Sequence, residues 1–199
     1  MNSAHQPTIP YLPARIEGLA QIAMNLWWSW NHEARGLFRA IDRPLWHQTR
    51  HNPLELLLRV DPARLAARAS DPDFLRRYDE VMAQLTSLGS NAETTYARRF
   101  GDLDGRRVAY FCAEFGLHSS VPIYSGGLGV LAGDHCKAAS DYGVPLVGIG
   151  LFYSKGYFDQ RLRLDGWQED SDVEFDLRHT PLVPVPAPGG EEHLTTVET

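Results

Sequence analysis

The sequence predicts an α/β fold in which a helical leader precedes the start of a parallel sheet. Two apolar, β-rich runs, 107–112 and 144–152, lie on either side of a run with helical spacing at 130–141. Strand, glycine turn, helix and strand make a βαβ unit, whose strands lie parallel and adjacent. The first hundred residues show helix starts and no strand alternation. We therefore divide the chain into an all-helical domain, residues 1–100, and a partial α/β lobe, residues 101–199.

The helical domain is marked by capping residues. Apolar spacing predicts an amphipathic helix from Ala14 to about Trp30, and Asn31 is expected to cap a second helix that runs to Ile41. A short third helix is expected to start at 43–46. A capping side chain stands directly before a helix-start proline at Asn52-Pro53, Asp61-Pro62 and Asp71-Pro72. These pairs predict helices over 54–60, 63–69 and 73 to about 88.

Three tryptophans, Trp27, Trp28 and Trp30, end the first predicted helix. Aromatic faces suit pyranose rings, so these side chains could form a glucan-binding surface. Several tryptophans on one helix more commonly anchor the packing between helices, because each buries a large apolar area. We therefore expect these tryptophans to pack within the helical domain.

The turn Ser125-Gly126-Gly127-Leu128-Gly129 is the chemical centre of the βαβ unit. Ser125 is expected to cap the following helix, while adjacent glycines permit positive φ and the close approach of a ligand. The first N–H groups of a helix lack intrahelical partners and carry partial positive charge, so this end can accept a phosphate or a sugar hydroxyl. Alternatively, the glycines only make a tight turn. The spacing is neither G-x-G-x-x-G nor a Walker A loop, so NAD and ATP are not indicated.

The connection from Cys112 to Leu128 is long for a link between a strand and its crossover helix. Connections at the carboxyl ends of parallel strands form the ligand sites of open α/β sheets. Glu114 lies in this connection and is a candidate ligand contact, or else a local capping or ion-pairing group. His118 is an acid–base candidate by residue type, without a partner visible in the sequence.

Composition excludes several classes of function. A net charge of −6 without a basic stripe argues against a nucleic-acid partner. Cys112 and Cys136 are too few for a disulfide scaffold and are expected as core thiols, and the scattered histidines lack the spacing of metal ligands. The sequence shows neither a signal-peptide pattern nor an apolar run of membrane-spanning length. A cytoplasmic location is therefore the default, and no membrane partner is expected.

After the second strand, 153–160 and 161–167 are interpreted as a hairpin with its turn at Asp165-Gly166. An acidic stretch at 169–172 follows, and then a strand-like run at 182–185. A β-prone run at 193–197 stops at Thr199 without a turn or tail. We interpret this ending as an interruption and expect the chain to be a fragment of a longer protein.

Several motifs, taken in order, resemble the N-terminal part of the α-glucan (glycogen/maltodextrin) phosphorylases. The motifs are Ala-Glu-Phe-Gly at 113–116, Tyr-Ser-Gly-Gly-Leu-Gly-Val-Leu-Ala-Gly-Asp at 124–134, Gly-Tyr-Phe-Asp-Gln at 156–160 and Asp-Gly-Trp-Gln-Glu at 165–169. The run 25–31, with Leu45-Trp46 and His51-Asn52-Pro53, is similar to the helical leader of the bacterial short-type members. The resemblance covers nearly the whole chain, but only the front of the family's usual length.

The resemblance implies a GT-B architecture of two Rossmann-like lobes, with 101–199 as the incomplete start of the first lobe. It implies cleavage of terminal α-1,4-glucosidic bonds by phosphate to give glucose 1-phosphate, with pyridoxal 5′-phosphate as cofactor. The implied partners are α-1,4-glucan and phosphate, and a homo-oligomer is left open. Gly126, Gly127 and Leu128 match the family's glycine loop, which contacts the substrate phosphate and the glucosyl residue. Glu114 matches the carboxylate of the family's Glu-Phe motif, and Ser125 stands where long-type members carry Asn.

The resemblance assigns substrate-binding residues but no catalytic, cofactor-binding or metal-binding residue to this chain. The family's Schiff-base lysine lies in the second lobe, and nothing around Lys137 or Lys155 resembles its motif. We therefore expect the chain alone to be inactive. One alternative is a glycogen/starch synthase-like glucosyltransferase, although those members usually carry Lys before the Gly-Gly pair and lack the helical leader. The other is a non-catalytic glucan-binding or assembly module that uses the tryptophan-rich helices.

Overall fold

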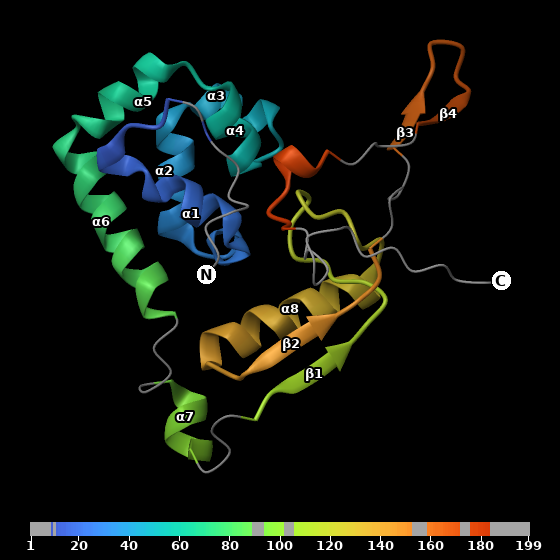
Figure 1. The fold of residues 1–199 in the computed structure, drawn as a ribbon. Coiled ribbons are helices and arrows are strands. Elements are labelled where there is room, and N and C mark those ends of the chain that lie inside the picture. Colours follow the sequence, from blue (N-terminus) through green and yellow to red (C-terminus); the bar gives the residue numbers. More distant parts are fainter. Residues whose placement is uncertain are drawn as a thin grey trace, which may run out of the picture.

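The computed structural model describes residues 9, 11–88, 94–101, 106–152, 159–171 and 176–183. The described residues form two groups of elements and a separate hairpin (Figure 1). We call residues 14–87 the helical unit and residues 108–149 the α/β unit. Helices and strands are both present, which confirms the mixed α and β character predicted from the sequence. No helix among the described residues is long and apolar enough to span a membrane.

The helical unit is a series of helices, most of which have a side-chain cap at the N-terminus. They are η2 (Ala14–Ile16), α1 (Gly18–Met24), η3 (Leu26–Ser29), α2 (His32–Ile41), α3 (Arg43–Gln48), α4 (Pro53–Arg59), α5 (Pro62–Ala69) and α6 (Pro72–Ser87). The predicted caps Asn31, Asn52, Asp61 and Asp71 each accept a hydrogen bond from a backbone N–H of the first turn. These caps satisfy donors that the helices cannot satisfy themselves.

The single helix predicted from Ala14 to Trp30 is wrong. The segment forms η2, α1 and η3. Asn25, which lies between α1 and η3, leaves the helical conformation with φ −102° and ψ 109°. Its side-chain Oδ1 accepts a hydrogen bond from Trp27 N at 3.0 Å and starts a new 3₁₀ turn. Asparagine competes in this way with the helical backbone for hydrogen bonds, so apolar spacing alone overestimated the helix.

The tryptophans pack within the helical unit, as predicted. Trp28 is 1% exposed and meets the rings of Phe38 and Trp46 edge-on, with centroids 6.2 and 5.9 Å away. Trp27 is also buried, while Trp30 is half-buried and donates from Nε1 to Asp141 Oδ1 at 3.0 Å. The burial of Trp27 and Trp28 leaves their faces unavailable for stacking on a sugar.

The α/β unit contains β1 (Val108–Phe111), α8 (Gly127–Tyr142) and β2 (Leu146–Ile149), and α7 (Thr95–Phe100) precedes it. The strands β1 and β2 pair in parallel, with Val108 opposite Leu146 and Phe111 opposite Ile149. Gly143 ends α8 in the left-handed conformation, with φ 72°. The βαβ unit predicted from the sequence is therefore present.

The hairpin consists of β3 (Asp159–Leu162) and β4 (Gln168–Ser171), which pair antiparallel. Its turn contains Asp165 and Gly166, as predicted, and Gly166 has φ 85°. The second strand was predicted too early, because residues 169–171 of the acidic stretch supply most of it. Residues 153–158 of the predicted first strand lie outside the described residues. Leu182 and Val183 form no strand, and the rest of that predicted run and the run at 193–197 lie outside the described residues.

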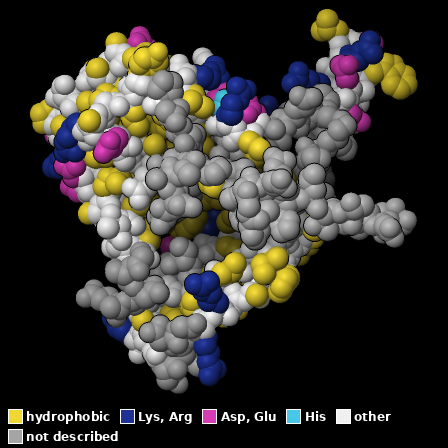
Figure 2. Space-filling model, viewed as in Figure 1, with side chains coloured by type: hydrophobic (Ala, Val, Ile, Leu, Met, Phe, Trp, Pro, Cys, Tyr) yellow, Lys and Arg dark blue, Asp and Glu magenta, His cyan; other side chains and the backbone are white. Residues whose placement is uncertain are grey.

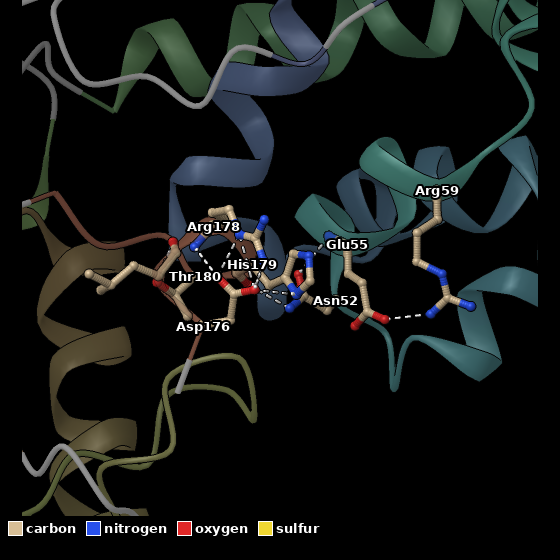
Figure 3. Close-up of polar contacts among 8 residues, drawn as sticks. Asn52, Glu55, Arg59, Asp176, Arg178, His179 and Thr180 are labelled. Carbon is tan, nitrogen blue, oxygen red and sulfur yellow. Dashed lines mark hydrogen bonds and ion pairs between the residues drawn. The ribbon is translucent and has the colours of Figure 1, made fainter. Parts of the chain in front are cut away.

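A short turn after the hairpin packs against the helical unit. This turn, η6 (Leu177–His179), accepts a hydrogen bond at His179 O from Asn52 Nδ2 at 2.7 Å (Figure 3). Asn52 thus caps α4 with its side-chain oxygen and holds η6 with its side-chain nitrogen. Within the turn, the Arg178 guanidinium beside Asp176 lowers the pKa of that carboxyl to about 2.

Candidate functional site

The candidate site lies where the connection from β1 enters α8. Ser125, Gly126, Gly127 and Leu128 are all exposed at this end of the helix. Because α8 is sixteen residues long, its first backbone N–H groups carry the partial positive charge of a full helix dipole. The five residues predicted to bind substrate, Glu114 and 125–128, therefore lie together at an open helix start.

Ser125 does not cap α8, which corrects the prediction from the sequence. The N-cap is Gly126, and no side chain caps this end. Ser125 instead donates twice to Glu114: its backbone N to Oε2 at 3.2 Å and its Oγ to Oε1 at 3.1 Å. These two bonds are neither a helix cap nor an ion pair, the local roles that the sequence left open for Glu114. The first N–H groups of α8 receive no capping bond from a side chain.

The glycines of the turn are not required by backbone conformation or by packing. Gly126 has φ −141° and ψ −157°, an extended conformation that any residue adopts. The positive-φ glycines of the described residues are Gly143 and Gly166, so the turn does not use the positive φ that its adjacent glycines permit. A Cβ built on Gly126 or Gly127 would have nothing within 4 Å. Glycine at these positions leaves the backbone amides uncovered, which permits close approach from outside.

Two glycines inside α8, in contrast, are required by packing. A Cβ on Gly133 would lie 2.1 Å from Gly116 O, and one on Gly129 would lie 2.4 Å from Tyr124 Cβ. Gly116 N also donates to Gly129 O at 2.7 Å. These contacts fix the first half of α8 against the connection that carries Glu114. Gly129 and Gly133 stand four residues apart and therefore lie on one face of α8.

His118 is directed toward the helical unit and not toward the turn. Its ring meets Trp28 at 4.6 Å, and its Nδ1 accepts a hydrogen bond from Ser120 N at 3.0 Å. Burial, followed by the charges of His51, Arg35 and Lys137, lowers the pKa of His118 to about 4. His118 is therefore neutral near pH 7, and its contacts are those of a packing residue that joins the two units.

The described residues do not fit a covalent pyridoxal phosphate site. Lys137 Nζ lies 3.7 Å from Asp134 Oδ1, an ion pair within α8, and Lys155 is outside the described residues. Among the described residues, no cluster of His, Cys, Asp or Glu could hold a metal ion. Cys112 and Cys136 are free and only half-buried, so the expectation of core thiols holds in part. Burial raises the pKa of the Cys136 thiol, which disfavours a reactive thiolate.

A cavity of about 600 Å³ lies near the C-terminal half of α8, away from the glycine turn. Its lining is mainly apolar and includes Leu26, Phe115, Cys136, Ala139, Leu146 and Phe152. The cavity joins residues of η3, the connection, α8 and β2, so it lies between the two units. The glycine turn is a better candidate than this cavity for a polar ligand, because backbone amides and a carboxylate lie close together there.

The fold and the site define an α/β protein with a helical leader and an open glycine turn at a helix start. Residues 12–121 match the family described as "Protein of unknown function (DUF3417)". The match covers more than half of the 199 residues, so the chain belongs to this family. The matched residues include the helical unit, β1 and Glu114, and they end before the glycine turn.

Several curated relatives are phosphorylases by name. The chain is 44% identical over 176 residues to a glycogen phosphorylase of Mycobacterium tuberculosis, covering 86% of the chain and 20% of that protein. It is 40% identical over 186 residues to a maltodextrin phosphorylase of Thermococcus litoralis, covering 94% and 22%. A glycogen phosphorylase of Aquifex aeolicus is 43% identical over 158 residues, covering 79% and 22%. These relatives confirm the resemblance to the N-terminal part of α-glucan phosphorylases, and the chain spans about a fifth of their length. No solved structure matches the chain.

Proposed function

We propose that the chain is the N-terminal part of an α-glucan phosphorylase, which cleaves terminal α-1,4-glucosidic bonds with phosphate and releases glucose 1-phosphate. The similarity to glycogen and maltodextrin phosphorylases over most of the chain carries this proposal. In this proposal residues 1–100 form a helical domain, and residues 101–199 start the first Rossmann-like lobe of a GT-B enzyme. A cytoplasmic location stays a prediction from the sequence.

The glycine turn is the proposed substrate site of this lobe. The uncovered amides of Gly127 and Leu128 at the start of α8 donate to phosphate oxygens or to hydroxyls of the terminal glucose. Glu114, Ser125 and Gly126 are the other residues that form this proposed site. The open space around both glycines supports this assignment, because neither glycine is needed for the fold itself.

Pyridoxal 5′-phosphate is the cofactor that the resemblance implies, and the described residues supply no lysine suited to hold it. The chain alone is therefore proposed to be inactive. Incubation of the purified chain with maltodextrin and phosphate should release no glucose 1-phosphate. Sustained release of glucose 1-phosphate would contradict the proposal that the catalytic residues lie outside this chain.

Binding at the turn can be tested by NMR on the ¹⁵N-labelled chain. Titration with glucose 1-phosphate and, separately, with inorganic phosphate should shift the amide signals of Gly126, Gly127 and Leu128 saturably. Glucose at the same concentration, and sodium sulfate at matched ionic strength, are the controls for the sugar and for the charge. Shifts confined to residues outside 113–130, or no saturable shift, would contradict a sugar-phosphate site at this turn.

The glucan-binding module is less well supported. That hypothesis depended on tryptophan faces in the helical unit, and Trp27 and Trp28 are buried there. The partly exposed Trp30 already uses its indole N–H to contact Asp141.

A further inference from the structure

Both carboxylate oxygens of Glu114 are directed at one residue of the glycine turn. Oε2 accepts from Ser125 N at 3.2 Å, and Oε1 accepts from Ser125 Oγ at 3.1 Å. The two residues are eleven positions apart, so this contact closes the loop that connects β1 to α8. A bidentate contact fixes orientation as well as distance, because neither hydrogen bond alone prevents rotation about the other.

The same carboxylate also lies beside the first turn of α8. Oε2 would be 3.1 Å from a Cβ built on Gly129, and Glu114 Cβ would be 3.3 Å from it. Glu114 therefore contacts the chain before the glycine pair, at Ser125, and lies close to the chain after it, at Gly129. Glycine has the largest backbone freedom of any residue, so Gly126 and Gly127 need anchors on both sides to keep one conformation.

The second anchor of the turn is a hydrogen bond between two backbone groups and involves no charged side chain. Gly129 O accepts from Gly116 N at 2.7 Å, two residues after Glu114 in the same connection. Residues 114–116 thus hold both ends of the glycine pair. Within this arrangement Glu114 is the group that determines the position of Ser125, the residue directly before the helix cap.

We propose that Glu114 is a positioning residue, which acts through Ser125 to hold the glycine pair, and with it the amides of Gly127 and Leu128, in its exposed arrangement and does not itself contact the ligand. The proposal deepens the proposed sugar-phosphate site and rests on it for the ligand. A carboxylate that faced a bound phosphate would repel it. A carboxylate that is hydrogen-bonded to Ser125 can support the turn without facing the phosphate.

The structural half of the proposal is tested without a ligand. Hydrogen exchange of the Ser125 amide, and ¹⁵N relaxation of Gly126 and Gly127, are measured by NMR in the wild type and in Glu114→Ala, Glu114→Gln, Ser125→Ala and Glu33→Gln. Glu114→Ala should raise the Ser125 exchange rate about tenfold, since a hydrogen bond to a charged group is lost. Glu114→Gln should give a smaller increase, because the amide oxygen replaces one of the two acceptors.

Ser125→Ala separates the two hydrogen bonds. It removes the hydroxyl and keeps the backbone donor, so the amide at position 125 should stay protected while the glycine signals report increased motion. Glu33→Gln removes a carboxylate from an exposed site on α2 and should change neither measurement. The exchange of α6 amides shows that each variant is folded. A Ser125 exchange rate within about twofold of wild type in Glu114→Ala would overturn the proposal.

The ligand half uses glucose 1-phosphate as the probe. If Glu114 positions the turn, the Ala and Gln variants should weaken binding in the order of their exchange rates. If Glu114 contacts the ligand, binding weakens while Ser125 exchange stays at the wild-type rate, and the positioning role is wrong. If wild type itself binds no glucose 1-phosphate, the proposed function fails, and the exchange rates still decide the role of Glu114.

Discussion

The helical unit and the α/β unit differ in how completely their apolar side chains are buried. The buried core cluster consists of residues from the helical unit and the segment just before it, including Trp28, Phe38 and Phe74. In the α/β unit, apolar side chains remain at the surface over the β1–β2 pair (Figure 2). Phe111 is 72% exposed and Val147 46%, although parallel strands are normally covered on both faces. Among the described residues, the helical unit therefore contains the larger buried core, and the proposed ligand site lies in the α/β unit.

The α/β unit, whose apolar side chains are less buried, is joined to the helical unit by specific contacts. Trp28 meets His118, and Trp30 donates to Asp141 at the C-terminal end of α8. A pair of strands with exposed apolar faces has little stability of its own, so the α/β unit relies on such contacts. Substitutions in the helical unit should accordingly affect stability most, and substitutions on exposed parts of the α/β unit should affect it least.

The largest expected effect is from Phe38→Ala. The Phe38 ring is fully buried and stacks on Trp46 with centroids 5.9 Å apart. Its truncation should reduce the free energy of unfolding by about 3–5 kcal/mol, measured by urea denaturation. Leu131→Ala on α8, where the side chain is 68% exposed, is the matched control and should change stability by less than about 0.5 kcal/mol. Equal losses in both variants would contradict the contrast between the units.

An intermediate effect is expected from pH, through His118 at the junction of the units. The unfolded chain binds a proton at His118 below about pH 6.5, whereas the folded chain does so only near pH 4. Stability should therefore fall as the pH drops from 6.5 to 4, by at most about 3 kcal/mol, and this loss should level off below pH 4. Urea denaturation across this range should show a shallower decline in His118→Gln. An unchanged decline would exclude His118 as its source.

The smallest expected effect concerns the caps, which the helical unit has and α8 lacks. Asp71 Oδ1 accepts from Asp73 N and Phe74 N at 3.1 and 3.2 Å. Asp71→Ala should cost about 1 kcal/mol of stability, and Asp71→Asn, which keeps the capping oxygen, should cost much less. Thermal unfolding followed by circular dichroism distinguishes these outcomes. A loss in the Asn variant as large as in the Ala variant would show that the charge of Asp71, and not its capping oxygen, is the stabilising feature.

Much of the fold could be predicted from the sequence, because its signals are local. A cap–proline pair such as Asn52-Pro53 determines a helix start through contacts between residues a few positions apart. Gly143 ends α8 because glycine readily adopts positive φ. The parallel pairing of β1 and β2 followed from the βαβ pattern. The break at Asn25 was missed, because a side chain competed with the helix that apolar spacing favoured.

The residues of the candidate site could be identified from the sequence, but their contacts with one another could not be predicted from it. The glycine turn and Glu114 were identified by motif and by their place after a strand. Their mutual arrangement depends on a contact across eleven residues, and a capping role for Ser125 was the simpler local alternative. Likewise, the sequence does not reveal that Gly133 is a packing glycine and Gly127 an uncovered one, since both are glycines of α8.

The comparison of Gly127→Ala with Gly133→Ala tests the central claim most directly. A methyl group at Gly127 meets open space, so this variant should fold with unchanged stability and lose the amide shifts caused by glucose 1-phosphate. A methyl group at Gly133 collides with Gly116 O, so that variant should lose about 1–3 kcal/mol of stability. If Gly127→Ala folds normally and binds glucose 1-phosphate as the wild type does, the glycine turn is not the sugar-phosphate site.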